Sequence, residues 1–153
     1  MHQPELRLCG ASSAHLRGWT LSELLICLAL MGTLAALALP VHLQQQRQAR
    51  RSDAQVALQL LQMDQARWRG QHERYSDSLT ALGWGSDLSP RGHYQISIPQ
   101  ADTEGYTLEA TPLGAQAADR ACSPLRLRWR GSASATFSAG PYPDSDPDRC
   151  WRQ

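Results

Sequence analysis

Glu23 is a single carboxylate at the head of a run that otherwise carries no charge. Every residue from Cys27 to Leu39 is uncharged, and Pro40 ends the run. An acid at the centre of a membrane helix costs roughly 2.5–3.5 kcal/mol on insertion scales, so an acid inside an apolar span is expected to have a function. Glu23 follows Trp19 closely, near the end of the run, where interfacial water lowers that cost.

The histidines form no catalytic or metal-binding pattern. The five of them are scattered, and the sequence holds no His-x-x-x-His, Cys-x-x-Cys or Gly-x-Ser-x-Gly spacing. The first two spacings bring two ligands to one metal ion, and the third forms the sharp turn that exposes a nucleophilic serine. We therefore expect no catalytic residues, no metal and no cofactor, and regard the protein as the substrate of an enzyme rather than as an enzyme.

The cysteines differ in their surroundings. Cys27 lies in the apolar run and is expected to be a small buried hydrophobe. Cys122 and Cys150 lie in the polar C-terminal half, where such a pair predicts a disulfide formed in an oxidising compartment. Closing that loop would stabilise the domain by roughly 3–4 kcal/mol on the entropic model. Two unpaired thiols are the alternative.

Three arginines alternate with apolar residues in the stretch Leu125–Arg130. The alternation predicts a strand whose buried face carries Leu125, Leu127 and Trp129. The other face carries Arg126, Arg128 and Arg130, either as a basic stripe for DNA phosphates or as a solvated surface. The formal net charge is only +1, and stacking aromatic residues do not flank the stripe, so the solvated surface is preferred.

Two helical segments precede that strand. Trp19 to Leu39 is long enough, at about 1.5 Å per residue, to cross the roughly 30 Å core of a bilayer. Val41 to Arg69 lacks Gly and Pro, which predicts a helix that continues past a kink at Pro40. Asp53 on this helix is expected to be a solvated surface acid. The face that should pack on a sheet carries Ala54, Ala57, Leu58, Leu61 and Trp68.

A loop and a small sheet follow. Gly and Ser residues after Gly70 predict a loop with one short helical turn, in which Tyr75 and Trp84 seal the edge of the core rather than bind a ligand. Strands are expected at His93–Ile98, stopped by Pro99, at Tyr106–Thr111, stopped by Pro112, at Leu125–Arg130 and at Ala133–Phe137. Residues 141–147 are expected to form a loop tethered by Cys150. The fold class is therefore α+β.

The stretch from Gly18 to Ile26, together with Pro40, resembles the type IV pilin signature. The resemblance implies that a prepilin peptidase cuts after Gly18 and methylates the new N-terminus at Trp19. Glu23 is then the fifth mature residue, and Pro40 is the helix-bending proline. Trp19 in place of Phe, and Ser22 in place of Ile or Val, depart from the usual pattern. Residues 1–18 lack an apolar core and so do not read as an ordinary secretory signal.

The C-terminal half is similar to PilE-type minor pilins. The matching residues are Gly92-His93-Tyr94, Tyr106-Thr107-Leu108, Ala110-Thr111-Pro112, Gly114-Ala115-Gln116, Asp119, Cys122 and the closing Cys150-Trp151. The resemblance implies the type IV pilin fold, in which a long N-terminal helix packs on a small antiparallel sheet with a disulfide-closed C-terminal region. It implies a minor subunit at or near the fibre tip that helps assembly. The alternatives are a DNA-uptake pilin and a type II secretion pseudopilin.

Three segments follow from the resemblance: a leader at 1–18, a transmembrane and assembly helix at 19–41, and a periplasmic globular domain at 42–153. The expected partners are other pilins, major and minor, the prepilin peptidase and the inner-membrane assembly platform. The subunit would sit in the inner membrane and then in the extracellular pilus. Arg47, Arg50 and Arg51 outnumber Arg17 across the span, which by itself would place the domain inside. The cysteine pair and the resemblance place it outside. In the fibre, the carboxylate of Glu23 would pair with the new N-terminal amine.

Overall fold

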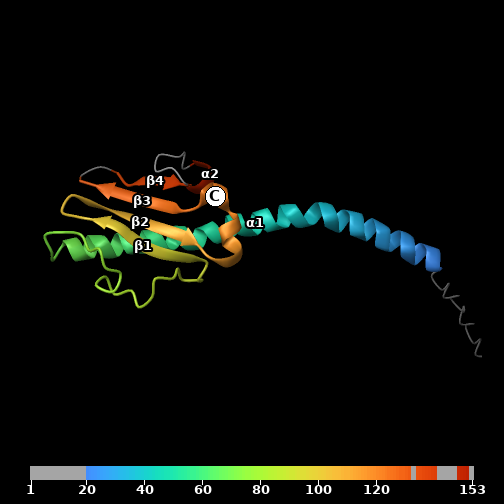
Figure 1. The fold of residues 1–153 in the computed structure, drawn as a ribbon, viewed down its shortest axis with the longest axis horizontal. Coiled ribbons are helices and arrows are strands. Elements are labelled where there is room, and N and C mark those ends of the chain that lie inside the picture. Colours follow the sequence, from blue (N-terminus) through green and yellow to red (C-terminus); the bar gives the residue numbers. More distant parts are fainter. Residues whose placement is uncertain (1–19, 132–133, 141–147, 152–153) are drawn as a thin grey trace, which may run out of the picture. The chain divides into compact units, whose positions relative to one another are not determined.

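The computed structural model describes residues 20–131, 134–140 and 148–151. The chain divides into two units, residues 1–39 and residues 40–153, which are described separately. Figure 1 shows the elements. The helices are α1 (Leu21–Arg69), the 3-10 turns η1 (Gly114–Ala118) and η2 (Arg120–Cys122), and α2 (Asp148–Trp151). The strands are β1 (Tyr94–Ala101), β2 (Gly105–Pro112), β3 (Leu125–Arg130) and β4 (Thr136–Ala139).

Helix α1 runs through Pro40 without ending there, as predicted. Glu23 lies in its first turn and Arg67 and Arg69 in its last, so the charges at both ends oppose the helix dipole. The helix ends before Gly70, at the point where the sequence changes from helix-forming residues to loop residues.

The four strands form one antiparallel sheet in the order β1-β2-β3-β4. Strand β3 has the predicted bounds. Strand β1 does not stop at Pro99 but continues to Ala101. Its pairing with β2 shifts register between Ser97 and Gln100, so the proline sits in an irregular stretch of an edge strand, where its missing N–H breaks no ladder. Strand β4 lies at Thr136–Ala139, further along the chain than expected.

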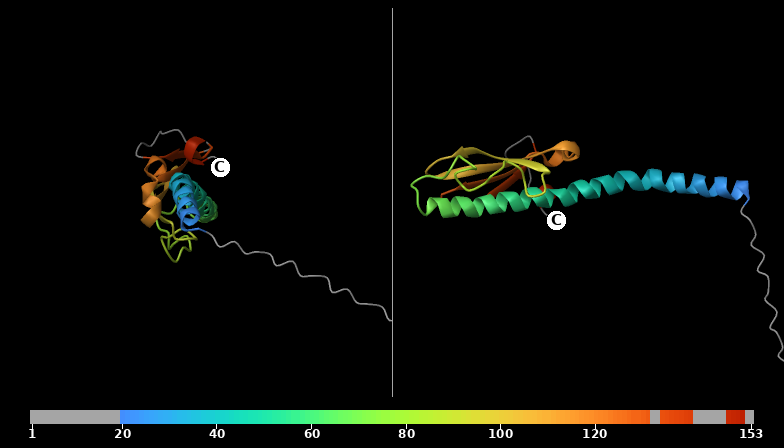
Figure 2. Two further views of the ribbon diagram at one scale, coloured as in Figure 1. Left: turned by 90° about the vertical axis from the view of Figure 1, so that its right-hand side faces the viewer. Right: turned by 90° about the horizontal axis from the view of Figure 1, so that it is seen from below.

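The core lies between one face of the sheet and the C-terminal half of α1, which runs along that face (Figure 2). The predicted helix residues Ala54, Ala57, Leu58 and Leu61 are fully buried, whereas Trp68 is only half-buried. They pack with residues from the sheet: Tyr94, Ile96, Leu108, Ala110, Leu125 and Leu127. Small alanine side chains at two helix positions let the helix approach the sheet closely.

The segment between α1 and β1 is a loop held by specific polar contacts. It forms turns but no α-helix. Gln65 on α1 is fully buried, and its amide donates to the carbonyl of Ser76 at 2.6 Å and accepts from the Ser76 N–H at 3.0 Å. Tyr75 is buried against Tyr106 and Trp129, as expected of a residue that seals the core. Trp84 is half-buried, and its indole N–H donates to Asp64 at 2.9 Å.

The β1–β2 hairpin turn is set by Asp102. Its carboxylate accepts from the backbone N–H groups of Glu104 (2.7 Å) and Gly105 (2.8 Å), which holds the pKa of Asp102 below its usual value. Gly105 follows, and a Cβ there would collide with the carbonyl oxygen of Trp129 on the neighbouring strand. A side chain at position 105 is therefore excluded by the close approach of β3.

Candidate functional site

The N-terminus of α1 is closed by reciprocal hydrogen bonds between Thr20 and Glu23. The Thr20 hydroxyl oxygen accepts from the Glu23 backbone N–H at 3.2 Å, and the Glu23 carboxylate accepts from the Thr20 backbone N–H at 3.1 Å. This is a capping box, which satisfies two N–H groups that a helix start otherwise leaves unpaired. The Thr-x-x-Glu spacing was visible in the sequence and was missed there. Gly18 and Trp19 lie outside the described residues.

The apolar residues of α1 up to Leu39 are all exposed in the chain taken alone. In the described part of the chain, α1 is the one helix long and apolar enough to cross a membrane by length and composition, and none of its apolar window is buried. A core helix of a soluble protein would be mostly buried. Cys27 is exposed here too, so its burial requires a membrane or a neighbouring subunit.

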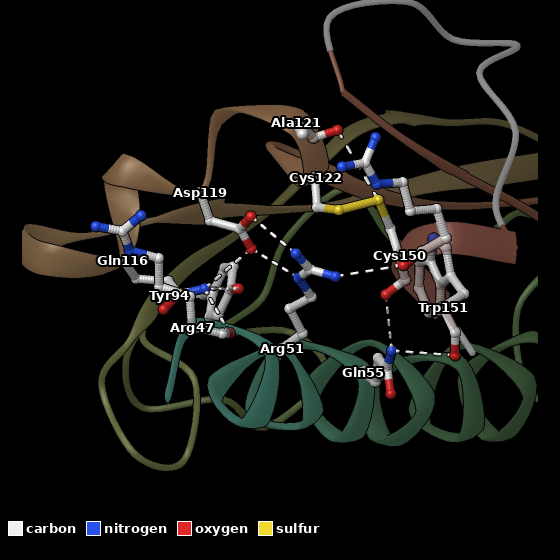
Figure 3. A network of polar contacts seen from close by, with 11 residues as sticks. Arg47, Arg51, Gln55, Tyr94, Gln116, Asp119, Ala121, Cys122, Cys150 and Trp151 are labelled. Atoms are coloured by element: carbon white, nitrogen blue, oxygen red, sulfur yellow. Dashed lines mark hydrogen bonds and ion pairs between the residues drawn. A yellow bond between two sulfur atoms is a disulfide. The ribbon is translucent and has the colours of Figure 1, made fainter. Parts of the chain in front are cut away.

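At the other side of Pro40, Arg51 on α1 joins the helix to the segment after β2. Its guanidinium makes two bonds to the Asp119 carboxylate, Nε–Oδ2 at 2.7 Å and Nη2–Oδ1 at 2.9 Å. The side chains of Arg51 and Asp119 are only 13% and 9% exposed. A bidentate pair sheltered from water fixes both position and angle. Figure 3 shows Arg51 between Asp119 and the C-terminal segment.

Gln116 extends the same network. Its side-chain amide donates to the backbone carbonyl of Arg47 at 3.0 Å and to the Tyr94 hydroxyl at 2.9 Å (Figure 3). Tyr94 is almost fully buried, and this burial raises its pKa to about 12. The network therefore ties α1, β1 and the 3-10 turn η1 together.

The predicted disulfide is confirmed and closes the C-terminal region. Cys122 and Cys150 are joined, 28 residues apart in sequence. Helix α1 also forms hydrogen bonds to this region. Gln55 donates to the carbonyls of Cys150 and Trp151, both at 3.3 Å, and Arg51 donates to the carbonyl of Arg149 at 3.3 Å (Figure 3). Residues 141–147, expected to be a loop, lie outside the described residues.

Asp53 is not a solvated acid, contrary to expectation. It is only 4% exposed. Its carboxylate accepts from the Ser89 hydroxyl at 2.6 Å and from the backbone N–H groups of Arg91 (3.0 Å) and His93 (3.3 Å). Three donors replace the water that the carboxylate loses, so Asp53 holds the segment before β1 against α1.

The three arginines of β3 do not form a uniform stripe. Arg126 is opposite Glu109 in the sheet register and pairs with it at 2.6 Å, while also donating to the carbonyl of Gly140 at 2.9 Å. Arg128 is exposed, and Arg130 is exposed at 4.0 Å from Glu104. Only Arg128 and Arg130 therefore present an accessible cation.

The aromatic residues nearest to these arginines face the core. Tyr106 on β2 and Trp129 on β3 stack on each other beside Tyr75. Burial, together with the neighbouring Tyr75, raises the pKa of Tyr106 to about 12. These rings are not on the face that carries Arg128 and Arg130, so they cannot stack on bases there.

The sequence is similar to known proteins. Residues 40–126, more than half of the chain, match the family described as "Type IV minor pilin ComP, DNA uptake sequence receptor". The "Type IV major pilin protein PilA" of Myxococcus xanthus (strain DK1622) is 34% identical over 88 residues, which are 58% of this chain and 40% of that protein. The similarity thus spans less than half the length of this curated relative.

Proposed function

This chain belongs to the type IV pilin family, among its minor pilins, and from that premise we propose that it is a membrane-anchored precursor cut after Gly18 and polymerised into a type IV pilus. The proposed segments are the leader at 1–18, the anchor and assembly helix at 19–41, and the globular domain at 42–153. The proposed partners are other pilins, the prepilin peptidase and the inner-membrane assembly platform. The proposed role is structural.

The observation that carries this proposal is the continuity of α1. The same helix that supplies an exposed apolar surface up to Leu39 supplies the core residues of the globular domain from Ala54 onward. A secretory signal that is cut off after export would separate these two parts. A cut after Gly18 instead leaves the apolar half attached, available first to the membrane and then to a fibre.

The disulfide favours a globular domain on the oxidising side of the membrane, the periplasm. Cys122–Cys150 is typical of proteins outside the reducing cytoplasm. We propose this orientation despite Arg47, Arg50 and Arg51, which follow the apolar run closely.

Intact-mass and N-terminal analysis tests the proposal on protein from membranes and from sheared surface fibres. We expect a chain that begins at methylated Trp19, is two hydrogens lighter than the reduced form, and is sparse in the fibres. An uncut chain that begins at Met1, has free thiols and is absent from fibres would overturn the proposal.

DNA binding is the second candidate, because the matched family is described as a DNA uptake sequence receptor. Two observations count against a stripe on β3. Arg126 is already paired with Glu109, and the neighbouring rings of Tyr106 and Trp129 lie on the other face of the sheet. Removing the leader also takes away Arg7, Arg17 and Glu5, which leaves thirteen arginines and thirteen acidic residues and no net charge.

A gel shift with the detergent-solubilised chain separates the two candidates. The informative variant is Arg128→Ala/Arg130→Ala, because changing Arg126 as well would leave Glu109 unpaired. A salt-dependent shift of duplex DNA that this double variant loses would establish DNA binding on β3. We expect no such difference between the variant and the natural chain.

A further inference from the structure

Four arginines lie at the end of the globular domain where α1 has just passed Pro40. We call Arg47, Arg50, Arg91 and Arg120 the basic collar. Arg91 and Arg120 are exposed, and Arg47 and Arg50 are half-buried. They come from three separate segments: α1, the loop before β1, and the turn η2.

Contacts already described hold these segments together. The Arg47 carbonyl accepts from Gln116 at 3.0 Å, which places η1 beside the first turns of α1 after Pro40. The Arg91 backbone N–H donates to Asp53, one turn beyond Arg50, at 3.0 Å. Arg120 directly follows Asp119, which Arg51 holds. The collar is therefore a built feature of the fold, not a set of unrelated surface residues.

The collar keeps its positive charge. Among the acids whose side chains the structure describes, Asp53 and Asp119 contact the collar segments, and both are occupied, the first by three N–H or O–H donors and the second by Arg51. The stretch from Val41 to Ser52 contains no acidic residue. Within the described residues, none of the four collar guanidinium groups forms an ion pair.

The collar also has a defined place along α1. At about 1.5 Å per residue, Arg47 lies roughly 10 Å beyond Pro40. The head-group layer of a bilayer is roughly 5–8 Å thick on each side of the hydrocarbon core, and arginine side chains extend along a helix to reach it. The apolar run ends at Leu39, so an Arg47 side chain that points back along the helix comes to lie at the depth of the lipid phosphates, and Arg50 lies about one turn farther from the bilayer.

We propose that the basic collar binds the head groups of anionic phospholipids on the surface of the membrane that holds α1. The proposal rests on the membrane anchoring proposed above and adds a second contact, by which the domain docks on the lipid surface before assembly. It also gives a function to arginines that follow the span on the side where the charge rule does not expect them. DNA phosphates are the competing partner; the place of Arg47 and Arg50 on α1, soon after the apolar run in the sequence, favours lipid.

Hydrogen exchange of the chain purified from membranes tests this in nanodiscs. One set of discs contains only phosphatidylcholine, and the other contains phosphatidylglycerol as well. We expect slower exchange of segments 41–52 and 113–121 in the anionic discs, and loss of this difference in concentrated salt. An arginine near an anionic surface contributes about a fivefold preference, so Arg47→Gln/Arg50→Gln/Arg120→Gln should lower the ratio of docked to undocked domain about 100-fold.

A matched control removes the same charge elsewhere. Arg74→Gln/Arg128→Gln/Arg130→Gln changes three exposed arginines outside the collar and should leave the lipid effect intact. Equal exchange in both kinds of disc, with 21–39 protected in each, would overturn the collar proposal and leave the membrane anchor standing. Exchange of 21–39 without protection would instead overturn the anchor. Protection of the collar segments by duplex DNA in phosphatidylcholine discs, with no effect of anionic lipid, would also overturn the collar proposal.

Discussion

Glu23 has two properties that substitutions can separate, its negative charge and its hydrogen bond to the helix start. Glu23→Gln keeps a side chain that serves in a capping box but removes the charge, whereas Glu23→Ala removes both. If Glu23 pairs with the amine of Trp19 in the fibre, both variants should be cut normally and both should fall severalfold in the ratio of fibre to membrane protein, measured by quantitative immunoblot. A Glu23→Gln variant that enters fibres in normal amounts would show that only the cap matters.

Thr20→Ala is the matched control for that experiment. It removes the hydroxyl that accepts from the Glu23 N–H but leaves the carboxylate charge in place. The loss of an N-cap costs about 1 kcal/mol of local helix stability, which is small beside an unpaired buried ion. We therefore expect Thr20→Ala to enter fibres close to the normal level.

Replacing the buried carboxylate of Asp53 should lower the stability of the domain. Asp53→Asn keeps the size of the side chain but replaces a charged acceptor of three hydrogen bonds by an amide, one half of which is a donor. We expect the free energy of unfolding to fall by about 3 kcal/mol, measured by urea denaturation in detergent. Asp77→Asn, on an exposed carboxylate, should change it by less than about 0.5 kcal/mol. Equal effects of the two variants would contradict the role given to Asp53.

The residues on which sequence reasoning failed share a cause. A periodic pattern of apolar residues shows which face of a helix is buried, so the alanines and leucines of α1 were placed correctly. The pattern does not show whether a polar residue at the border of that face is buried, so Asp53 was placed wrongly. Its donors come from the loop before β1, about 36 residues away in sequence for Ser89. Arg126 was likewise read as free because its partner, Glu109, becomes a neighbour only once the register of β2 and β3 is known.

At the scale of elements, the C-terminal segment is joined to the turn η2 by a disulfide and to α1 by hydrogen bonds. Cys150→Ser prevents the disulfide from forming and so removes a constraint worth about 3–4 kcal/mol on the entropic model, while the hydrogen bonds from Gln55 and Arg51 remain. We expect a lower free energy of unfolding and faster proteolysis after residue 140. Cys27→Ser, at the free thiol in α1, is the control and should change neither quantity.

Strands were predictable in proportion to how regular they are. Leu125–Arg130 alternates without interruption and was placed to the residue. The predicted end of β1 at Pro99 was wrong. A proline normally ends a strand, whereas this one occupies an irregular stretch at the edge of the sheet. The 3-10 turns η1 and η2 have no periodic pattern, and their positions depend on Gln116 and Asp119 reaching partners on α1, β1 and in η1 itself.

For the whole molecule, two buried tyrosines predict alkaline unfolding. In the unfolded chain a tyrosine has a pKa of about 10, whereas Tyr94 and Tyr106 are both raised to about 12 by burial in the folded domain. The folded state holds these protons more tightly. The stability they confer is therefore complete below pH 10 and is lost as the pH rises from about 10 to 12.

Absorbance of tyrosinate and circular dichroism, recorded together through this range, check that expectation. Tyr106→Phe should flatten the fall in stability between pH 10 and 12, because phenylalanine has no proton to lose. A stability profile that is flat across that range in the natural chain, or is unchanged by the substitution, would contradict the assignment of these groups.

The two outer strands of the sheet, β1 and β4, determine whether sheets of neighbouring subunits can pair at high local concentration. The first half of β1 is shielded by a bridge from Leu88 to Gln95 and by the Ile96 N–H bond to Asp87, and its second half contains Pro99. At the opposite edge, β4 is only four residues long, and the Trp151 indole binds the carbonyl of Ser138. Open strand edges let sheets of neighbouring molecules fuse. In the described part of the chain, both borders are blunted, so neighbouring subunits at high density find little open strand edge through which their sheets could pair.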